Sequence, residues 1–242
     1  MFLCLAAGVA SGGPSASYPV GPVDAKTLSV QQKVDALFDA GDYERALFIY
    51  KNELAPLGDK YAQYMVGYMH LIGAGVDEDP VMASAWYRLA AERGSPNFVT
   101  VRDELLSSLS DFHLGRSDEL YLQLRRKYSD IVILARLIRE DLELISERTG
   151  SRITVSSHPG TIVDPHTGFT MSSDAYYRQL SRRVDSRLAM IAGELGIDPD
   201  GLSAARVDID EIDRLVAERV TVINDRGGIN ASVRPTESSG TD

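Results

Sequence analysis

The four histidines are the first residues to examine for chemistry, because imidazole acts as a general base and as a zinc ligand near neutral pH. His158 and His166 flank Asp164 in the sequence, and one interpretation is a small metal site. The alternative is an ordinary exposed position for both, since each is next to a proline in a turn-like segment. No pairing of a nucleophile with a base is recognisable around these two residues or around His70 and His113. The sequence therefore predicts no catalytic residue, no bound metal and no cofactor.

Three short segments share features with ligand-binding loops. Gly73-Ala74-Gly75 is half of a phosphate-binding loop, but it lacks a preceding strand, a third glycine and the Lys-Ser/Thr pair. Asp198-Pro-Asp200-Gly201 and Asp208-Ile-Asp210 have closely spaced carboxylates, but not the ligand order or terminal glutamate of a calcium loop. An interhelical turn explains the first segment, and helix N-caps explain the other two.

Two clusters of basic residues interrupt an acidic chain. They are Arg125-Arg126-Lys127 and a set on one expected helix, namely Arg178, Arg182, Arg183 and Arg187. The second set lies off the apolar stripe of its helix, which favours a solvated face. The alternative is a contact with an acidic partner or an anionic polymer.

Composition excludes several classes of function. The formal net charge of −10 and the pI near 4.9 argue against nucleic-acid binding, which needs clustered lysine and arginine. No apolar run approaches the roughly 20 residues that a membrane-spanning helix needs. Cys4 is the only cysteine, so neither a disulfide nor a cysteine metal site can form within the chain. A hydrophobic content of 44% is normal for a globular protein.

The segment 62–94 has small and aromatic residues at helix-packing spacing on both sides of a glycine-rich turn. The first helical face contains Ala62 and Gly67, and Gly94 ends the second helix. The residues expected at the turn and at the contacts of the second helix are Gly73, Gly75, Ala83, Trp86, Tyr87 and Ala90. This spacing predicts a helix–turn–helix unit whose two backbones pack closely.

The order of these residues resembles the Sel1-like repeat, a helical unit related to the TPR. The matching positions are Ala62, Val66-Gly67, Gly73-Ala74-Gly75-Val76, Asp79, Ala83, Trp86-Tyr87 and Ala90-Ala91. His70 departs from the pattern, because the family usually has tyrosine there, but histidine can fill the same space. The resemblance implies a short α-solenoid of stacked helical pairs.

The neighbouring segments extend this pattern in both directions. Ala46 and Ala83 are 37 residues apart, and so are Tyr50 and Tyr87, which is typical of a stacked helical repeat. We therefore expect a preceding helical pair around a turn at residues 40–43. A further helix is expected over Asn97–Leu109, and a capping helix over Asp118–Lys127.

Beyond Ser129 the pattern changes to longer amphipathic helices and short β-type runs. A helix begins after Ser129-Asp130 and ends at Thr149-Gly150, and others are expected over Asp174–Leu195 and Ile209–Ile223. The β-type runs are Ile153–Val155, Thr161–Val163 and Phe169–Met171, which favour a hairpin within 153–171. The stripe of the second helix, Tyr177, Leu180, Val184, Leu188, Ile191 and Leu195, either folds into a small bundle with its neighbours or pairs with a partner helix.

The N-terminal residues Phe2–Ala10 form a short apolar run before a Ser-Gly-Gly-Pro segment, which indicates a secretory signal peptide without its basic n-region. A buried N-terminal element is the alternative. The expected organisation is a signal peptide over 1–17, a linker over 18–28, helical repeats with a cap over 29–128, a helical C-terminal region over 129–226 and a polar tail over 227–242. The expected fold class is mostly α. We expect the protein to be periplasmic or otherwise exported, and a cytoplasmic location is the alternative.

These features predict a non-enzymatic protein that binds a protein or peptide partner, since stacked helical pairs present an extended concave surface. Tyr61, Tyr64 and Tyr68 lie on one face of the first repeat helix, and we expect them to contact the partner. The alternative for Tyr64 is internal packing of the repeat. The alternative function is an envelope enzyme or polymer-binding protein whose active part is the C-terminal region.

Overall fold

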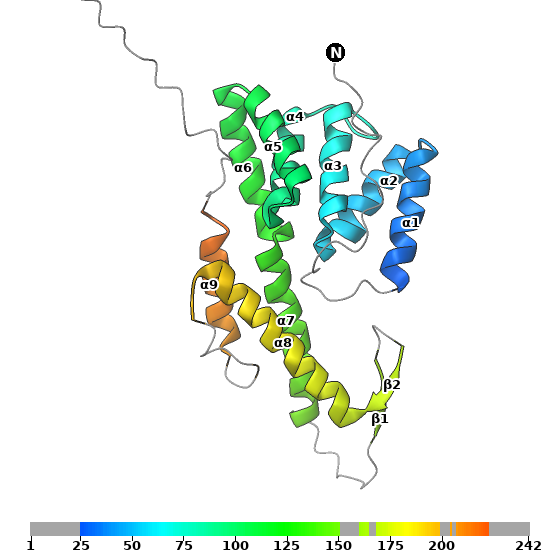
Figure 1. Cartoon of the computed structure of the whole chain (residues 1–242), viewed down its shortest axis with the longest axis vertical. Coiled ribbons are helices and arrows are strands. Elements are labelled where there is room, and N and C mark those ends of the chain that lie inside the picture. The colour runs from blue at the N-terminus through cyan, green and yellow to red at the C-terminus, as the bar shows by residue number, and fades with distance from the viewer. Residues whose placement is uncertain (1–24, 151–159, 165–167, 199–203, 205–206, 223–242) are drawn as a thin grey trace, which may run out of the picture.

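A computed structural model describes residues 25–150, 160–164, 168–198, 204 and 207–222 (Figure 1). This part of the chain is mostly helical and contains one small antiparallel sheet, so the predicted fold class is confirmed. None of the helices in this part combines the length and the apolar character needed to cross a membrane. The expected signal peptide, the polar tail and the β-type run at 153–155 lie outside the described residues.

The first helical pair consists of α1 (Ala25–Asp39) and α2 (Tyr43–Ile49). Gly41 joins them with a φ of +79°, a conformation that favours glycine. The chain then continues through a π-helical segment, η1 (Tyr50–Leu54), and a 3-10 turn, η2 (Ala55–Leu57). Val34, Ala46, Tyr50 and Leu54 are buried in the core of the repeats.

The second pair consists of α3 (Lys60–Ile72) and α4 (Pro80–Ala90), followed by the short η3 (Ala91–Arg93). The Asp59 side chain caps α3 by accepting the Ala62 N–H at 3.0 Å. Asp79 caps α4 by accepting the N–H groups of Val81 and Met82. These two caps define where each helix of the pair begins.

Close packing within this pair explains its small residues. A Cβ on Gly67 would lie 2.7 Å from the Tyr87 ring and 3.1 Å from the Ala83 carbonyl oxygen, so α3 and α4 approach too closely for a side chain there. A Cβ on Gly75 would lie 2.6 Å from the Tyr43 backbone, because the α3–α4 turn packs directly on the start of α2. The buried residues from the expected contact set are Ala46, Ala62, Gly67, Ala83, Trp86, Tyr87 and Ala90, whereas Gly73 and Gly94 end helices in the left-handed conformation.

The third pair consists of α5 (Pro96–Ser108) and α6 (Asp111–Tyr128). The capping helix predicted over residues 118–127 is too short, because α6 begins at Asp111, about two turns before the predicted start. Ser110 accounts for the early start, since its hydroxyl accepts the His113 N–H and caps the helix. Helix α6 packs on α4 through a buried hydroxyl pair, Ser84 and Ser117, whose oxygens are 2.6 Å apart.

The C-terminal elements are α7 (Asp130–Gly150), β1 (Thr161–Val163), β2 (Thr170–Ser172), α8 (Ser173–Leu195) and α9 (Ile209–Arg219). Helix α8 crosses α7, and α9 lies beside them at the end nearer the repeats (Figure 1). Their shared core contains Ile131, Leu134, Ile138, Val184, Leu188, Ile191, Ile212 and Val216. Of the two alternatives for the α8 stripe, the structure therefore shows the bundle.

The hairpin predicted from the runs Thr161–Val163 and Phe169–Met171 is confirmed. Strands β1 and β2 pair antiparallel with Ile162 opposite Met171. Two details of α8 and α9 differ from expectation. At the start of α8 the buried tyrosine is Tyr176, 7% exposed, while Tyr177 is half-buried. Both are within one turn of Leu180, and spacing alone does not select between them. Helix α9 ends at Arg219, earlier than predicted.

Candidate protein-binding site

An aromatic surface runs across the first helices of the three pairs. We define it as Phe38 on α1, Tyr61, Tyr64 and Tyr68 on α3, and Phe98 on α5. The Tyr64 ring stacks on Tyr68, with ring centroids 6.3 Å apart, and on Phe98 at 5.4 Å. Tyr68 reaches Phe38 on the other side, at 6.4 Å. The i, i+3, i+7 spacing on α3 thus places the three tyrosines where they bridge the neighbouring pairs.

The three tyrosines differ in what they offer a partner. Tyr64 also stacks on Tyr87 of α4 at 5.2 Å, so much of its surface serves the internal packing of the repeat. Tyr61 contacts Tyr50 and Tyr64 at its edges but remains 40% exposed. The structure therefore makes Tyr61 the most accessible tyrosine of the predicted stripe, while Tyr64 next to it and Tyr68 beyond Tyr64 are half-buried.

Carboxylates from α1 and from the start of α3 lie close to Tyr61. Asp35 accepts a hydrogen bond from the Tyr50 hydroxyl at 2.7 Å, and Tyr50 in turn packs edge-on against Tyr61. Asp59 accepts the Gln31 amide at 2.7 Å while capping α3. Asp39 follows Asp35 by one turn on α1 and is also exposed. The accessible end of the aromatic surface is thus acidic.

The electrostatics of the tyrosines follow from this arrangement. Burial raises the pKa of Tyr61 to about 12, and the nearby carboxylates of Asp35 and Asp59 and the Tyr64 phenol add to the increase. Burial also raises the pKa of Tyr64 and of Tyr87, which lie close together. All three phenols therefore stay protonated at neutral pH, where each can donate one hydrogen bond.

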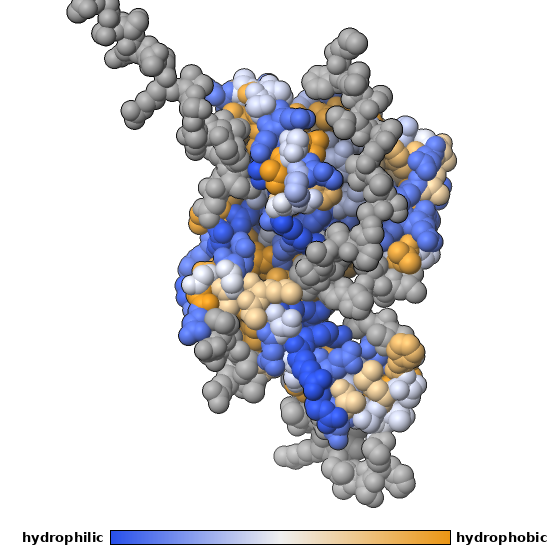
Figure 2. Space-filling model, viewed as in Figure 1, coloured by the Kyte–Doolittle hydropathy of each residue, from blue (hydrophilic) through white to orange (hydrophobic). Residues whose placement is uncertain are grey.

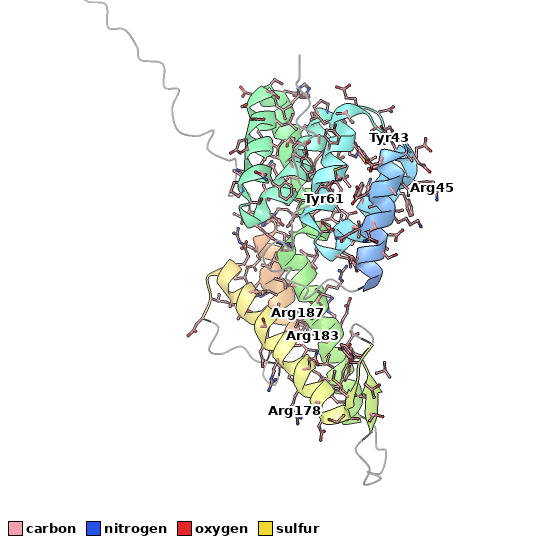
Figure 3. The ribbon with its side chains drawn as sticks, turned by 45° about the vertical axis from the view of Figure 1, so that its right-hand side comes forward. Tyr43, Arg45, Tyr61, Arg178, Arg183 and Arg187 are labelled. Atoms are coloured by element: carbon pink, nitrogen blue, oxygen red, sulfur yellow. The ribbon has the colours of Figure 1, made fainter. Side chains whose placement is uncertain are left out.

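The predicted basic set on α8 does not form a single cationic face. Arg183 donates two hydrogen bonds to Asp141 of α7, at 2.7 and 3.1 Å, and Arg187 donates to the same carboxylate at 2.6 Å. Asp141 is 4% exposed, so these pairs hold α8 against α7 inside the bundle. Arg178 and Arg182 are exposed, and a hydrophilic band follows the first half of α8 (Figure 2). Figure 3 shows Arg178, Arg183 and Arg187 along α8, well away from Tyr61.

The cluster at the end of α6 is divided in the same way. Arg125 is 6% exposed, lies over the Tyr121 ring and donates to the Val222 carbonyl oxygen at 2.5 Å, so it joins α6 to the residues after α9. Lys127 lies over Tyr128, with Nζ 4.9 Å from the ring centroid. Arg125 therefore has a structural role, whereas Arg126 and Lys127 are exposed.

The remaining candidates for chemistry are placed as follows. His158 and His166 lie outside the described residues, and within the described ones no three His, Cys, Asp or Glu side chains are grouped as metal ligands. His70 is 8% exposed under the α3–α4 turn, and burial lowers its pKa. Asp208 accepts the N–H groups of Asp210 and Glu211, so it is the N-cap of α9 rather than part of a calcium loop.

Stacked helical pairs joined by a shared row of aromatic rings define a TPR-like α-solenoid. Comparison with protein families matches the Sel1 repeat to residues 60–95, which form the α3–α4–η3 unit. The chain therefore contains a Sel1 repeat, and repeats of this family are in general non-enzymatic modules for protein–protein interaction. No curated protein and no solved structure matched the chain.

Proposed function

We propose that this protein is a non-enzymatic scaffold that binds a protein partner through the aromatic surface of its repeats. The observation that carries the proposal is the exposure of Tyr61, 40%, at the accessible end of a row of packed aromatic rings. Tyrosine offers a large contact area with few rotatable bonds, and a ring held by its neighbours loses little further freedom when a partner binds.

Site-specific cross-linking in the native host tests this proposal. A photo-reactive phenylalanine analogue at position 61 should capture a defined partner, and a matched probe at position 177, a half-buried tyrosine of the C-terminal bundle, should not. Tyr61→Ala should reduce co-purification of the captured protein while the chain stays folded at the temperature of the assay, because the ring is 40% exposed and its contacts with Tyr50 and Tyr64 lie at the edge of the core. Equal capture at both positions would show that the repeats do not provide the binding surface.

We also propose that the protein acts in the periplasm or cell envelope of a bacterium. The apolar run Phe2–Ala10, followed by small and turn-forming residues, supports export. The mature protein should then begin between Ala10 and Tyr18, which N-terminal sequencing of natively expressed protein measures. Recovery of an intact Met1 from a cytoplasmic fraction would rule out this proposal.

A further inference from the structure

The acidic end of the aromatic surface has a composition that suits one kind of partner. Asp35 and Asp39 are both exposed and lie one turn apart on the same side of α1. Among the described residues, neither carboxylate forms an ion pair, although Oδ1 of Asp35 accepts the Tyr50 hydroxyl. The accessible Tyr61 ring is within their electrostatic influence, as its raised pKa also indicates.

The same molecule shows how a cation is held by such a combination of groups. The Arg88 guanidinium lies 4.0 Å from the centroid of the Tyr121 ring and donates to Asp118 at 2.7 Å. One arginine is thus held by a tyrosine face and a carboxylate together, which is a favourable arrangement for a planar cation. At the surface of the repeats, Tyr61 supplies the ring and Asp35 and Asp39 supply the carboxylates.

We propose that this surface binds an arginine-bearing segment of the protein partner, with a guanidinium placed over Tyr61 and paired with Asp35 or Asp39. This inference rests on the proposed function, because it names the chemistry of the partner at the same site. Charge complementarity supports it twice, since the local carboxylates and the formal net charge of −10 both favour a cationic partner.

A peptide titration tests the chemistry directly. The probe is a fluorescein-labelled peptide of three Gly-Ser-Arg repeats, and the controls replace arginine by citrulline, a neutral analogue of similar shape, or by glutamate. At low ionic strength the full chain should bind the arginine peptide about tenfold more tightly than the citrulline peptide, and 0.5 M salt should largely remove that difference. The glutamate peptide should not bind. Equal binding of the arginine and citrulline peptides, or no binding of the arginine peptide, would overturn the inference.

Charge-neutral variants locate the effect on the surface. Asp35→Asn with Asp39→Asn should weaken the arginine peptide about fivefold, as expected for the loss of two exposed charges. Asparagine keeps an oxygen acceptor for the Tyr50 hydroxyl, and Asp39→Asn alone serves if the double variant unfolds. The matched control is Glu140→Gln with Glu143→Gln on α7, which changes the net charge equally at exposed positions and should leave binding unchanged. If both double variants lost the same affinity for the arginine peptide, only the net charge of the chain would matter, and the inference would be wrong.

The two proposals can fail separately. If the partner captured at position 61 is bound equally well by the Asp35→Asn, Asp39→Asn variant, the surface binds its partner without an arginine contact, and only the further inference is wrong. If capture at position 61 is no stronger than at position 177, the proposed function itself is wrong.

Discussion

Arg93 and Asp130 form a two-point ion pair that joins the repeats to the C-terminal bundle. Arg93 donates from Nε to Oδ2 of Asp130 at 2.8 Å and from Nη2 to Oδ1 at 2.9 Å. Lys60 Nζ lies 3.1 Å from the same carboxylate and 2.7 Å from Glu92. The start of α3, the end of η3 and the start of α7 therefore meet in one charge network, which fixes the direction in which the bundle leaves the repeats.

Asp130→Asn should destabilise this junction. The substitution leaves Lys60 and Arg93 without one of their anions in a partly desolvated place, at a cost of about 2–3 kcal/mol in the free energy of unfolding. Urea unfolding measures the difference. Glu140→Gln on the same helix is the control, and it should change stability by less than about 0.5 kcal/mol, because its pair with Arg136 is exposed. A similar effect of both variants would show that the network does not stabilise the junction.

Gly67→Ala should lower stability by about 1–3 kcal/mol, because the added methyl group meets the Tyr87 ring and the Ala83 carbonyl. Gly115→Ala is a matched control, since Gly115 is inside α6 with nothing within 4 Å of an added Cβ. That control should raise stability by about 0.5–1 kcal/mol through helix propensity. Thermal unfolding measures the change in stability of both variants relative to the wild type. If both variants were stabilised, or both destabilised, the result would contradict the close approach of α3 and α4. Ala83→Leu should be destabilising for the same reason as Gly67→Ala, because Ala83 is fully buried.

Leu188→Asp should unfold the bundle. Leu188 is fully buried between α7 and α9, and an unpaired carboxylate there costs several kcal/mol. The near-neighbour Met190 is 41% exposed, so Met190→Asp should leave the fold intact. Limited proteolysis followed by mass spectrometry would show cleavage within α7–α9 in the first variant and the wild-type pattern in the second. A wild-type pattern in both variants would argue against the packed bundle.

Alkaline pH should weaken the repeats through their tyrosines. The pKa of Tyr61 is about 12 in the folded chain against about 10 in the unfolded chain, so the folded state keeps a proton that the unfolded state loses. The stabilisation is fully present below pH 10 and is lost as the pH rises toward 12. The slope of the unfolding free energy against pH between 10 and 12 reports how many protons are released on unfolding. In Tyr61→Phe that number should be smaller by about one. An unchanged slope would mean that Tyr61 titrates normally.

The sequence by itself determined the helical pairs and their contacts. Gly67 and Ala83 are small because two helices meet there, and that requirement is visible as spacing along the chain. The apolar stripe through Leu188 likewise predicted a buried helix face before any partner was known. Local caps such as Ser110 were less visible, which is why α6 was predicted to begin too late.

Only the tertiary structure decided which faces meet across long intervals of sequence. Spacing indicates that Arg183 and Arg187 lie on one side of α8, but the position of α7 brings Asp141 to them and removes them from the surface. In the same way, the packing of α1 against α2 and η1 brings Asp35 to the Tyr50 hydroxyl, and Tyr50 packs on Tyr61 of the Sel1 repeat. Helical periodicity orients a side chain about its own axis, whereas the partner of that side chain depends on how separate helices pack, and no local pattern specifies that arrangement.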